Sequence, residues 1–335
     1  MQHDGIRDIC IIFMDFHLEF SPRPLESLIN HQHKLLLIGS CFTENIGTKL
    51  KQHKFSILEN PNGILFNPTS ISKSLNSYIE NKQYSSDDLF YENESWHSWQ
   101  HHSRFSNPDK DAAIQVINQS QTEAHHFLKQ ADWILITLGS AFVYITKNGE
   151  PVANCHKVPT DKFNKHLLSI DEVVTMLNNI IQQLLEFNPK LKIIFTISPV
   201  RHLRDGFVEN NRSKATLIHA VHQLVNQSDR FFYFPAYELV IDDLRDYRFY
   251  AEDMVHPNYT ATNYVWDKFV STCIDEPSQK LMKEINEINA AKNHKPFNPT
   301  SSQHKKFLQT NFEKVKKLQV AYPYINFKEE VDFFS

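Results

Sequence analysis

Two short segments of this sequence carry side chains that could serve as a nucleophile and as its base. Residues 39–41 read GSC and place a hydroxyl and a thiol directly after an apolar run. Residues 253–257 read DMVHP and place a carboxylate three residues before an imidazole. A carboxylate can fix the tautomer of a histidine, whose other nitrogen then takes the proton of a nucleophile. We therefore predict that Asp253 and His256 are the acid and the base of an acyl-transfer site.

The nucleophile of such a site could be either Cys41 or Ser40. Both follow a predicted strand and open a predicted helix, and a helix N-terminus lowers the pKa of a thiol. We therefore expect Cys41 to form a thiolate near neutral pH. The opposing interpretation is that Cys41 packs as a small buried hydrophobe while the Ser40 hydroxyl attacks. Successive side chains at a strand end point to opposite sides, so only one of the two can face His256.

Five short apolar runs would form the sheet that positions these segments. They cover residues 34–38, 55–58, 133–138, 193–197 and 231–234, and helical patterns follow at 43–53, 169–187 and 213–226. Buried strands that alternate with helices are typical of an α/β fold with a parallel sheet covered on both faces. Active sites of open parallel sheets form outside the carboxyl ends of the strands. Since each candidate segment follows such a run, both are expected at that edge.

A long insertion separates the second run from the third, and its residues 96–105 are rich in aromatic and histidine side chains. We predict that His101 and His102 form a pocket wall that hydrogen-bonds to a polar, sugar-like substrate. Arg201 and His202, after the fourth run, are predicted to line the same pocket. His97 and His101 have the i, i+4 spacing that can bind a metal on a helix, but no carboxylate stands at a standard spacing from them. We predict no metal and no other cofactor.

The composition of the 335-residue chain disfavours several classes of partner. A net charge of −4 argues against nucleic-acid and membrane-surface binding. No apolar run approaches the roughly 18 residues of a membrane helix, and residues 10–14 are too short for a signal peptide. Met14 could be the natural start, with residues 1–13 an upstream extension. No CxxC pair occurs among the four cysteines, which predicts reduced thiols and a cytoplasmic protein.

The two segments also carry a family resemblance. Residues 39–43 (GSCFT) and 253–257 together resemble the SGNH (GDSL-type) hydrolase superfamily and, within it, the GSCFA family, with threonine here in place of the last alanine. Further similar segments are residues 60–68, 96–105, 153–157, 198–202 and 246–253. The resemblance runs from about residue 15 to residue 275. It implies a three-layer α/β/α, flavodoxin-like fold with a five-stranded parallel sheet, and a site that handles esters or acyl groups.

The resemblance also implies roles for single residues. Its register puts Cys41 at the nucleophile position, and Gly63 matches the glycine whose backbone N–H stabilises the oxyanion. The superfamily's oxyanion-hole asparagine is Ala141 here, with Ser140 beside it as a candidate binding residue. One lost donor costs about 10²–10³ in rate, so either another group replaces it or hydrolysis is slow. The candidates for that replacement are Asn62, Asn67 and His102.

These observations predict a catalytic domain at residues 15–275 and a C-terminal helical extension at residues 276–335. The predicted function is an SGNH-like ester hydrolase or acyltransferase that acts on a small-molecule or carbohydrate acyl substrate. Two alternatives stay open. The first is a non-catalytic carbohydrate- or acyl-binding protein on the same fold, in which the lost asparagine reflects lost catalysis. The second is a metalloenzyme built on the histidine-rich insertion.

Overall fold

A five-stranded parallel sheet forms the centre of the molecule, with the strand order β10-β9-β5-β1-β2. Its strands are β1 (Lys34–Gly39), β2 (Ser56–Glu59), β5 (Trp133–Leu138), β9 (Lys192–Ile197) and β10 (Phe231–Tyr233). The first and last residues of each strand differ by at most one position from those of a predicted apolar run. The computed structural model describes residues 18–335; Cys10, Met14 and the first residues of the predicted catalytic domain lie outside them.

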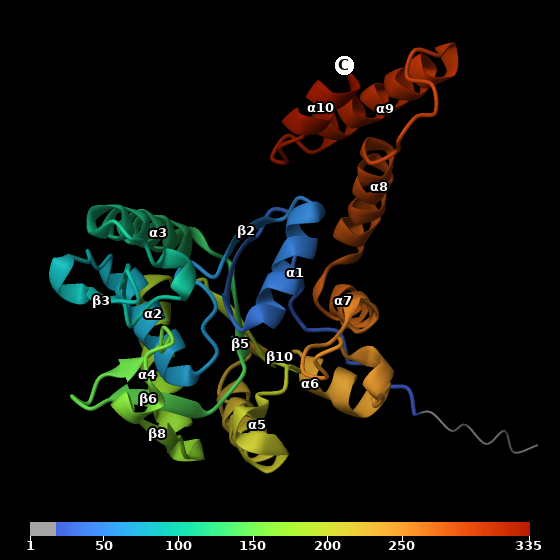
Figure 1. Cartoon of the computed structure of the whole chain (residues 1–335). Coiled ribbons are helices and arrows are strands. Elements are labelled where there is room, and N and C mark those ends of the chain that lie inside the picture. The colour runs from blue at the N-terminus through green and yellow to red at the C-terminus, as the bar shows by residue number, and fades with distance from the viewer. Residues whose placement is uncertain (1–17) are drawn as a thin grey trace, which may run out of the picture.

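Helices cover both faces of the sheet and make three layers (Figure 1). One face packs against α2 (Pro68–Glu80), α3 (Lys110–Gln130), α4 (Ile170–Phe187) and α5 (Gly206–Val225). The other packs against α1 (Cys41–Gln52) and α7 (Tyr259–Cys273). Strand β1 shows why: Leu36 and Ile38 point into the first core, and Leu35 and Leu37 point into the second. The predicted three-layer, flavodoxin-like α/β/α class is confirmed.

The predicted helices differ from the observed ones mainly at their N-termini. Ser40 caps α1, and Ser169 forms a capping box with Glu172 at the start of α4, where the helix was expected. Helix α5 begins at Gly206, well before the predicted residue 213. Its first turns carry exposed Phe207 and Val208 and lack an apolar face toward the sheet, so the hydrophobic period used for the prediction is missing there.

The insertion between β2 and β5 contributes α2, α3 and a hairpin of β3 (Phe90–Glu92) and β4 (Ser95–His97). A second sheet, which was not predicted, is antiparallel with the order β7-β6-β8. Its strands are β6 (Phe142–Thr146), β7 (Pro151–Val152) and β8 (Phe163–Leu167). Short helical turns complete the domain: η1 (Ser86–Asp88), η2 (Ser103–Phe105), η3 (Thr160–Lys162), η4 (Leu203–Asp205), α6 (Ala236–Glu238), η5 (Leu239–Leu244) and η6 (Tyr247–Phe249).

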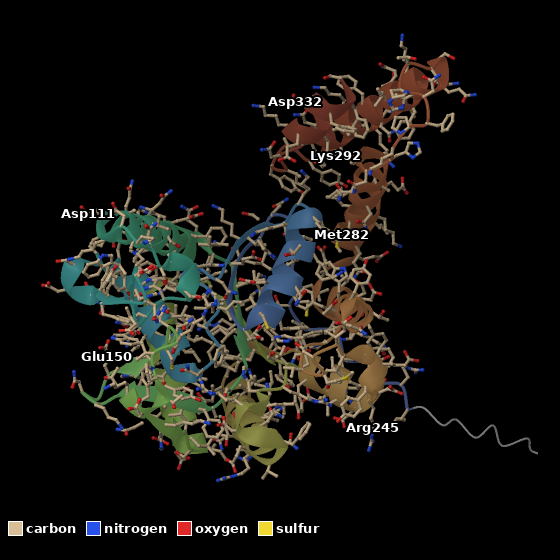
Figure 2. All side chains as sticks on the ribbon, in the orientation of Figure 1. Asp111, Glu150, Arg245, Met282, Lys292 and Asp332 are labelled. Atoms are coloured by element: carbon tan, nitrogen blue, oxygen red, sulfur yellow. The ribbon has the colours of Figure 1, made fainter. Side chains whose placement is uncertain are left out.

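Helices α8 (Glu276–Lys292), α9 (Ser302–Ala321) and α10 (Lys328–Phe334) project from the sheet domain beyond α7 (Figure 1). They share a core of their own, which includes Ile285, Val315 and Phe327. Met282, labelled in Figure 2, lies on the part of α8 near α7 and packs in the core that contains α1. The boundary at residue 276 stays a prediction. Among residues 18–335, no helix has the length and apolar character needed to cross a membrane.

Candidate active site

The turn after β1 holds both candidate nucleophiles and gives them different surroundings. Ser40 is only 2% exposed, and its Oγ accepts a hydrogen bond from the Phe42 N–H (3.3 Å) as the N-cap of α1. Cys41, the first residue of α1, is partly exposed. The Ser40 hydroxyl therefore supports the helix start, and the Cys41 thiol is the more accessible of the two groups.

Glycine is required at the end of β1 because of close backbone packing. A Cβ on Gly39 would lie 2.4 Å from the Thr137 carbonyl oxygen on β5. The Gly39 N–H donates to Oδ1 of the buried Asn60 (2.8 Å), and the Ser40 N–H donates to Thr137 O (3.2 Å). These contacts hold the turn of residues 39–41 against the carboxyl ends of both neighbouring strands.

The pKa of Cys41 is raised, so the expectation of a thiolate near neutral pH was wrong. Burial is the largest cause, and the Glu44 carboxylate on the next turn adds to it. The N–H groups of Phe42 and Cys41 lower the pKa, as does the Lys214 ammonium, but they do not outweigh the loss of water. In the free protein, Cys41 is therefore a thiol that needs a base.

The predicted acid and base form the expected pair. Asp253 Oδ2 lies 2.7 Å from His256 Nδ1, and Asp253 Oδ1 accepts from the N–H groups of Val255 (2.9 Å) and His256 (3.0 Å). These bonds, led by the His256 N–H, lower the pKa of Asp253 to about 2. The His256 side chain is 50% exposed, and its Nε2 has no partner among residues 18–335. This nitrogen is free to take a proton from a substrate or a nucleophile.

Arg201 supports the loop that carries this pair, which differs from its predicted place in a pocket wall. Its N–H donates to the Val255 carbonyl (3.2 Å), and its guanidinium donates to the Met254 carbonyl (3.4 Å). The guanidinium carbon also lies 4.0 Å from the centre of the Tyr250 ring. Because Arg201 comes just after β9, these contacts bring the Asp253–His256 loop to the carboxyl edge of the sheet.

His202 lies in the segment after β9 and packs next to Gly139, which follows β5. Its ring packs on Phe66 (centroids 4.8 Å apart), and its buried Nε2, near Gly139, has no hydrogen-bond partner within residues 18–335. Burial, then the positive charges of Lys214 and His256, lower its pKa to about 3. His202 is therefore neutral at physiological pH.

Two of the predicted oxyanion donors, Gly63 and Asn62, and the candidate binding residue Ser140 already make hydrogen bonds within the protein. The Gly63 N–H donates to the Asn60 carbonyl (2.7 Å), and Asn62 Nδ2 donates to Ser74 Oγ (3.1 Å). Ser140 Oγ accepts from the Phe142 N–H (3.1 Å) and is buried. In this conformation the Gly63 N–H and one N–H of Asn62 are therefore engaged by neighbouring groups, and Ser140 is buried.

Of the two insertion histidines predicted to form a pocket wall, His102 lines a cavity and His101 does not. His101 is 1% exposed, contacts Ser98 Oγ through Nδ1 (2.9 Å) and packs against Tyr84 and Phe105. Desolvation lowers its pKa to about 3. The adjacent His102 lines the cavity, and Gly63, which has no side chain, leaves the room that the Cβ of His102 occupies. The two histidines therefore differ in burial because of the turn that the chain makes at residues 101–102.

The cavity beside the site has a volume of about 600 Å³. It is bounded by the loop after β2, by β6 and by the segment between β7 and β8. Its lining includes aromatic and polar side chains: Phe66, Asn67, His102, Tyr144, Asn154 and Phe163. Asn67 also caps α2 through Oδ1. Phe66 lines this cavity, and its ring also packs on His202.

Both ring nitrogens of His97, which was considered as a metal ligand, contact other groups in hydrogen bonds. Nε2 lies 2.9 Å from the Glu92 carbonyl oxygen, and Nδ1 lies 2.6 Å from Ser106 Oγ. Within the described part of the chain, no three His, Cys, Asp or Glu side chains are grouped so that they could hold a metal ion.

Lys214 is the residue that the sequence reasoning missed. It lies on α5, is 1% exposed, and its Nζ donates to the carbonyls of Gly139 and Ser198. The signal was present, because Lys214 shares the apolar spacing of Leu217 and Val221 on the buried face of the helix. A lysine in that row predicts a buried amine.

Comparisons with known proteins agree with the motifs. The model of the GSCFA family matches residues 34–269, and that of a GSCFA domain protein's C-terminal domain matches residues 285–335. No curated protein matches the chain.

Solved structures with a similar arrangement include a carbohydrate esterase family 3 protein from Talaromyces cellulolyticus. It is 11% identical, with 76% of this chain and 99% of that chain covered and a TM-score of 0.35. An acetyl xylan esterase from the rumen bacterium Butyrivibrio proteoclasticus is also 11% identical, with 73% of this chain and 64% of that chain covered and a TM-score of 0.35. Since the first family match spans well over half of the sequence and includes both motifs, the chain belongs to the GSCFA family.

Proposed function

We propose that this protein is an SGNH-like ester hydrolase or acyltransferase in which Cys41 attacks the acyl carbonyl. The observation that carries the proposal is the Asp253–His256 pair, held at 2.7 Å with His256 Nε2 unpartnered among residues 18–335. The loop that bears the pair is bonded to Arg201 at the carboxyl end of β9, and Cys41 follows the carboxyl end of β1. In an open parallel sheet this edge is where ligands bind.

In the first half-reaction, the Cys41 Sγ–H proton passes to His256 Nε2 while sulfur bonds to the carbonyl carbon. Asp253 stabilises the imidazolium that forms, as in other triads. The Cys41 N–H at the first position of α1 is the remaining donor for the oxyanion, because the Phe42 and Thr43 N–H groups already donate to Ser40. The tetrahedral intermediate then collapses, the proton on His256 goes to the leaving oxygen, and a thioester remains.

In the second half-reaction, His256 takes a proton from water or from an acceptor hydroxyl, whose oxygen attacks the thioester. The C–S bond breaks and the proton returns to sulfur. Hydrolysis and transfer differ only in the acceptor. Ser40 is the weaker candidate for the nucleophile because its hydroxyl caps α1 and is buried.

The adjoining cavity supports an acylated sugar as the substrate class. Phe66, Tyr144 and Phe163 offer aromatic faces for the C–H side of a sugar ring. Asn67 and His102 add polar groups suited to hydroxyls. In this proposal His102 contacts the substrate, as predicted for a pocket wall, and Asn67 is a substrate contact where the sequence had suggested an oxyanion donor.

Trapping of the acyl-enzyme tests the proposal. Purified protein is mixed with p-nitrophenyl acetate, quenched in acid and digested, and the acetylated peptide is identified by mass spectrometry. We expect the adduct on the peptide that contains Cys41, its loss in Cys41→Ala and its slower formation in His256→Ala. Absence of both adduct and turnover with acetyl esters and acetylated sugars contradicts the proposal, and an adduct kept in Cys41→Ala but lost in Ser40→Ala transfers the role to Ser40.

A second candidate function is non-catalytic binding of the same ligands. Two observations favour it: the raised pKa of Cys41, caused chiefly by burial, and the engagement of the Gly63 and Asn62 donors within their own loop. A binding protein would show saturable binding of an acetylated sugar by calorimetry, with the sugar recovered unchanged after long incubation.

A further inference from the structure

The cavity of about 600 Å³ beside the loop after β2 has two cationic side chains in its wall. Lys157 and Arg204 are among its lining residues, whereas no Asp or Glu of residues 18–335 lines it. The lining histidines His102 and His156 add no charge at neutral pH, because burial lowers the pKa of both, to about 4 for His156. A cavity of this volume is typical of small-molecule sites. Its charge therefore favours an anionic small molecule.

The two cations have no anionic partner in the described part of the chain. No carboxylate of residues 18–335 forms an ion pair with Lys157 or Arg204. Asp205, which follows Arg204 in the sequence, pairs with Lys165 instead. The Arg204 guanidinium carbon lies 5.7 Å from the centre of the Tyr144 ring, which also lines the cavity. Both positive groups are therefore available to a ligand, and Arg204 stands beside an aromatic face.

Lys157 occupies a turn position that glycine would fill with less strain. Residues 155–158 form a turn in which the Val158 N–H donates to the Cys155 carbonyl (2.9 Å). Its two central residues have positive φ, +49° for His156 and +61° for Lys157, as in a type I′ turn. The buried His156 anchors the turn through Nε2, which lies 2.9 Å from the Ser98 carbonyl oxygen. Since the backbone does not favour lysine here, what the lysine contributes is the charge of its side chain.

One wall of the cavity is bonded to the strand ends that carry the proposed active site. The Leu65 N–H donates to the Gly39 carbonyl (3.1 Å), and the Gly139 N–H donates to the Phe66 carbonyl (2.7 Å). Gly39 ends β1 just before the turn that holds Cys41, and Gly139 follows β5. Because Phe66 lines the cavity, this wall belongs to the carboxyl edge of the sheet.

We propose that the acylated sugar on which this protein acts bears an anionic group, a carboxylate or a phosphate, and that Lys157 and Arg204 bind this group. That the sugar is acylated rests on the proposed function, whereas recognition of an anionic sugar does not. A guanidinium binds a carboxylate or a phosphate through two parallel N–H···O bonds, and an ammonium adds a compact positive charge. The aromatic and amide groups of the same cavity contact the sugar ring and its hydroxyls.

Binding of matched charged and neutral sugars tests this inference. Methyl glucuronide, glucose 6-phosphate and methyl glucoside are titrated calorimetrically into wild type, Arg204→Gln, Lys157→Gly and Lys162→Gln. Lys162 is the matched control, because it is an exposed lysine of the same segment that does not line the cavity.

We expect a charged sugar to bind wild type about tenfold more tightly than methyl glucoside, and to lose about that factor in Arg204→Gln and in Lys157→Gly. Lys162→Gln should match wild type. Added NaCl should weaken binding of the charged sugar and leave that of methyl glucoside unchanged. Tighter binding of the glucuronide identifies a carboxylate as the anionic group, and tighter binding of glucose 6-phosphate identifies a phosphate.

Unfolding of Lys157→Gly in urea separates recognition from a structural role. Glycine relieves the strain of the positive φ, so this variant should be at least as stable as wild type while it binds the charged sugar more weakly. A Lys157→Gly protein that is less stable than wild type would show that the lysine serves the turn, and would overturn its part in the proposal.

Three results of the titrations overturn the proposal: equal affinities for charged and neutral sugars, no binding of either charged sugar, or equal losses in all three variants. None of these measurements uses acyl turnover. An acyl-enzyme on Cys41 without any preference for charged sugars would keep the proposed function and reject this inference. Binding of a charged sugar by a protein without acyl turnover would do the reverse.

Discussion

At the scale of single residues, the proposed chemistry depends on a half-exposed carboxylate, that of Asp253, whose hydrogen bonds hold it in one orientation. Asp253 accepts from two backbone N–H groups with one oxygen and faces His256 with the other. Because these bonds lower its pKa to about 2, the stability they provide is present above the unfolded value of about 3.9. It is lost as the pH falls through about 2.

Replacement of this carboxylate should reduce catalysis without disturbing the loop. Asp253→Asn keeps the acceptor for the Val255 and His256 N–H groups but no longer fixes the His256 tautomer. We expect kcat for p-nitrophenyl acetate to fall about 10³–10⁴-fold, with little change in KM. Glu252→Gln, an exposed neighbour, is the matched control and should keep wild-type kcat. Equal activity of the two variants would show that Asp253 does not orient the base.

Buried histidines should make the protein sensitive to mild acid, and His101 is the best case for a test. Its pKa is lowered to about 3 by burial, so the unfolded state binds a proton that the folded state does not. The contribution of His101 to the free energy of unfolding is therefore fully present above about pH 6.5, and it falls by about 1.4 kcal/mol per pH unit below that. Between pH 7 and pH 5, His101→Phe should lose about 2 kcal/mol less than wild type in urea unfolding. His219→Gln, on an exposed position, controls for the loss of a histidine; equal losses in wild type and His101→Phe would contradict this assignment.

At the scale of elements, the loops after the strands are shaped by a few glycines with positive φ. Gly63 has a φ of +83°, and a Cβ there would lie 2.2 Å from Cβ of His102. The glycine therefore lets the insertion return to the sheet and sets the place of His102 at the cavity.

A comparison of two glycines separates backbone strain from this steric contact. Gly149 has a similar φ of +86°, but a Cβ at that position would meet no other segment of residues 18–335 within 4 Å. Gly149→Ala should cost about 1 kcal/mol in the free energy of unfolding, from the left-handed backbone alone. Gly63→Ala should cost about 3 kcal/mol or more, because the His102 segment must also shift. Equal costs in urea unfolding would mean that the loop moves freely.

At the scale of the whole molecule, the C-terminal helices are joined to the sheet domain by polar contacts with the end of α1. Glu330 on α10 is almost fully buried and pairs with Lys54 after α1 (2.7 Å). Asn289 Nδ2 on α8 donates to the Gln52 carbonyl (2.9 Å). These contacts link the last helices to the helix that begins with Cys41.

Removal of the buried charge should loosen this attachment. Glu330→Gln leaves Lys54 without its carboxylate and should lower the free energy of unfolding by about 1–3 kcal/mol. Glu329→Gln removes the neighbouring exposed carboxylate that pairs with Lys292 and should leave the free energy of unfolding close to that of wild type. Amide hydrogen exchange in α10 should rise only in the first variant. Unchanged exchange there would show that apolar contacts alone hold the extension.

Local patterns in the sequence were enough to predict the sheet and the motif residues. Five apolar runs of strand length, each ended by a turn residue, predicted the parallel strands, because burial on both faces requires such runs. The spacing of Asp253 and His256 within one turn predicted their pairing, because only local backbone separates them. The same local logic located Ser40 at the start of a helix.

Which side chains are free to act depends on how the folded chain packs. Adjacent residues His101 and His102 have the same chemistry, yet one is buried in the core and the other lines a cavity. The pKa of Cys41 is raised because the loss of water raises it more than the N–H groups at the helix N-terminus lower it. How much water is lost depends on the packing of the folded chain around the turn. Lys214 meets the ends of β5 and β9 only after the sheet has assembled, since 75 residues separate it from Gly139. Burial and long-range contacts are properties of the packed chain, and local patterns do not contain them.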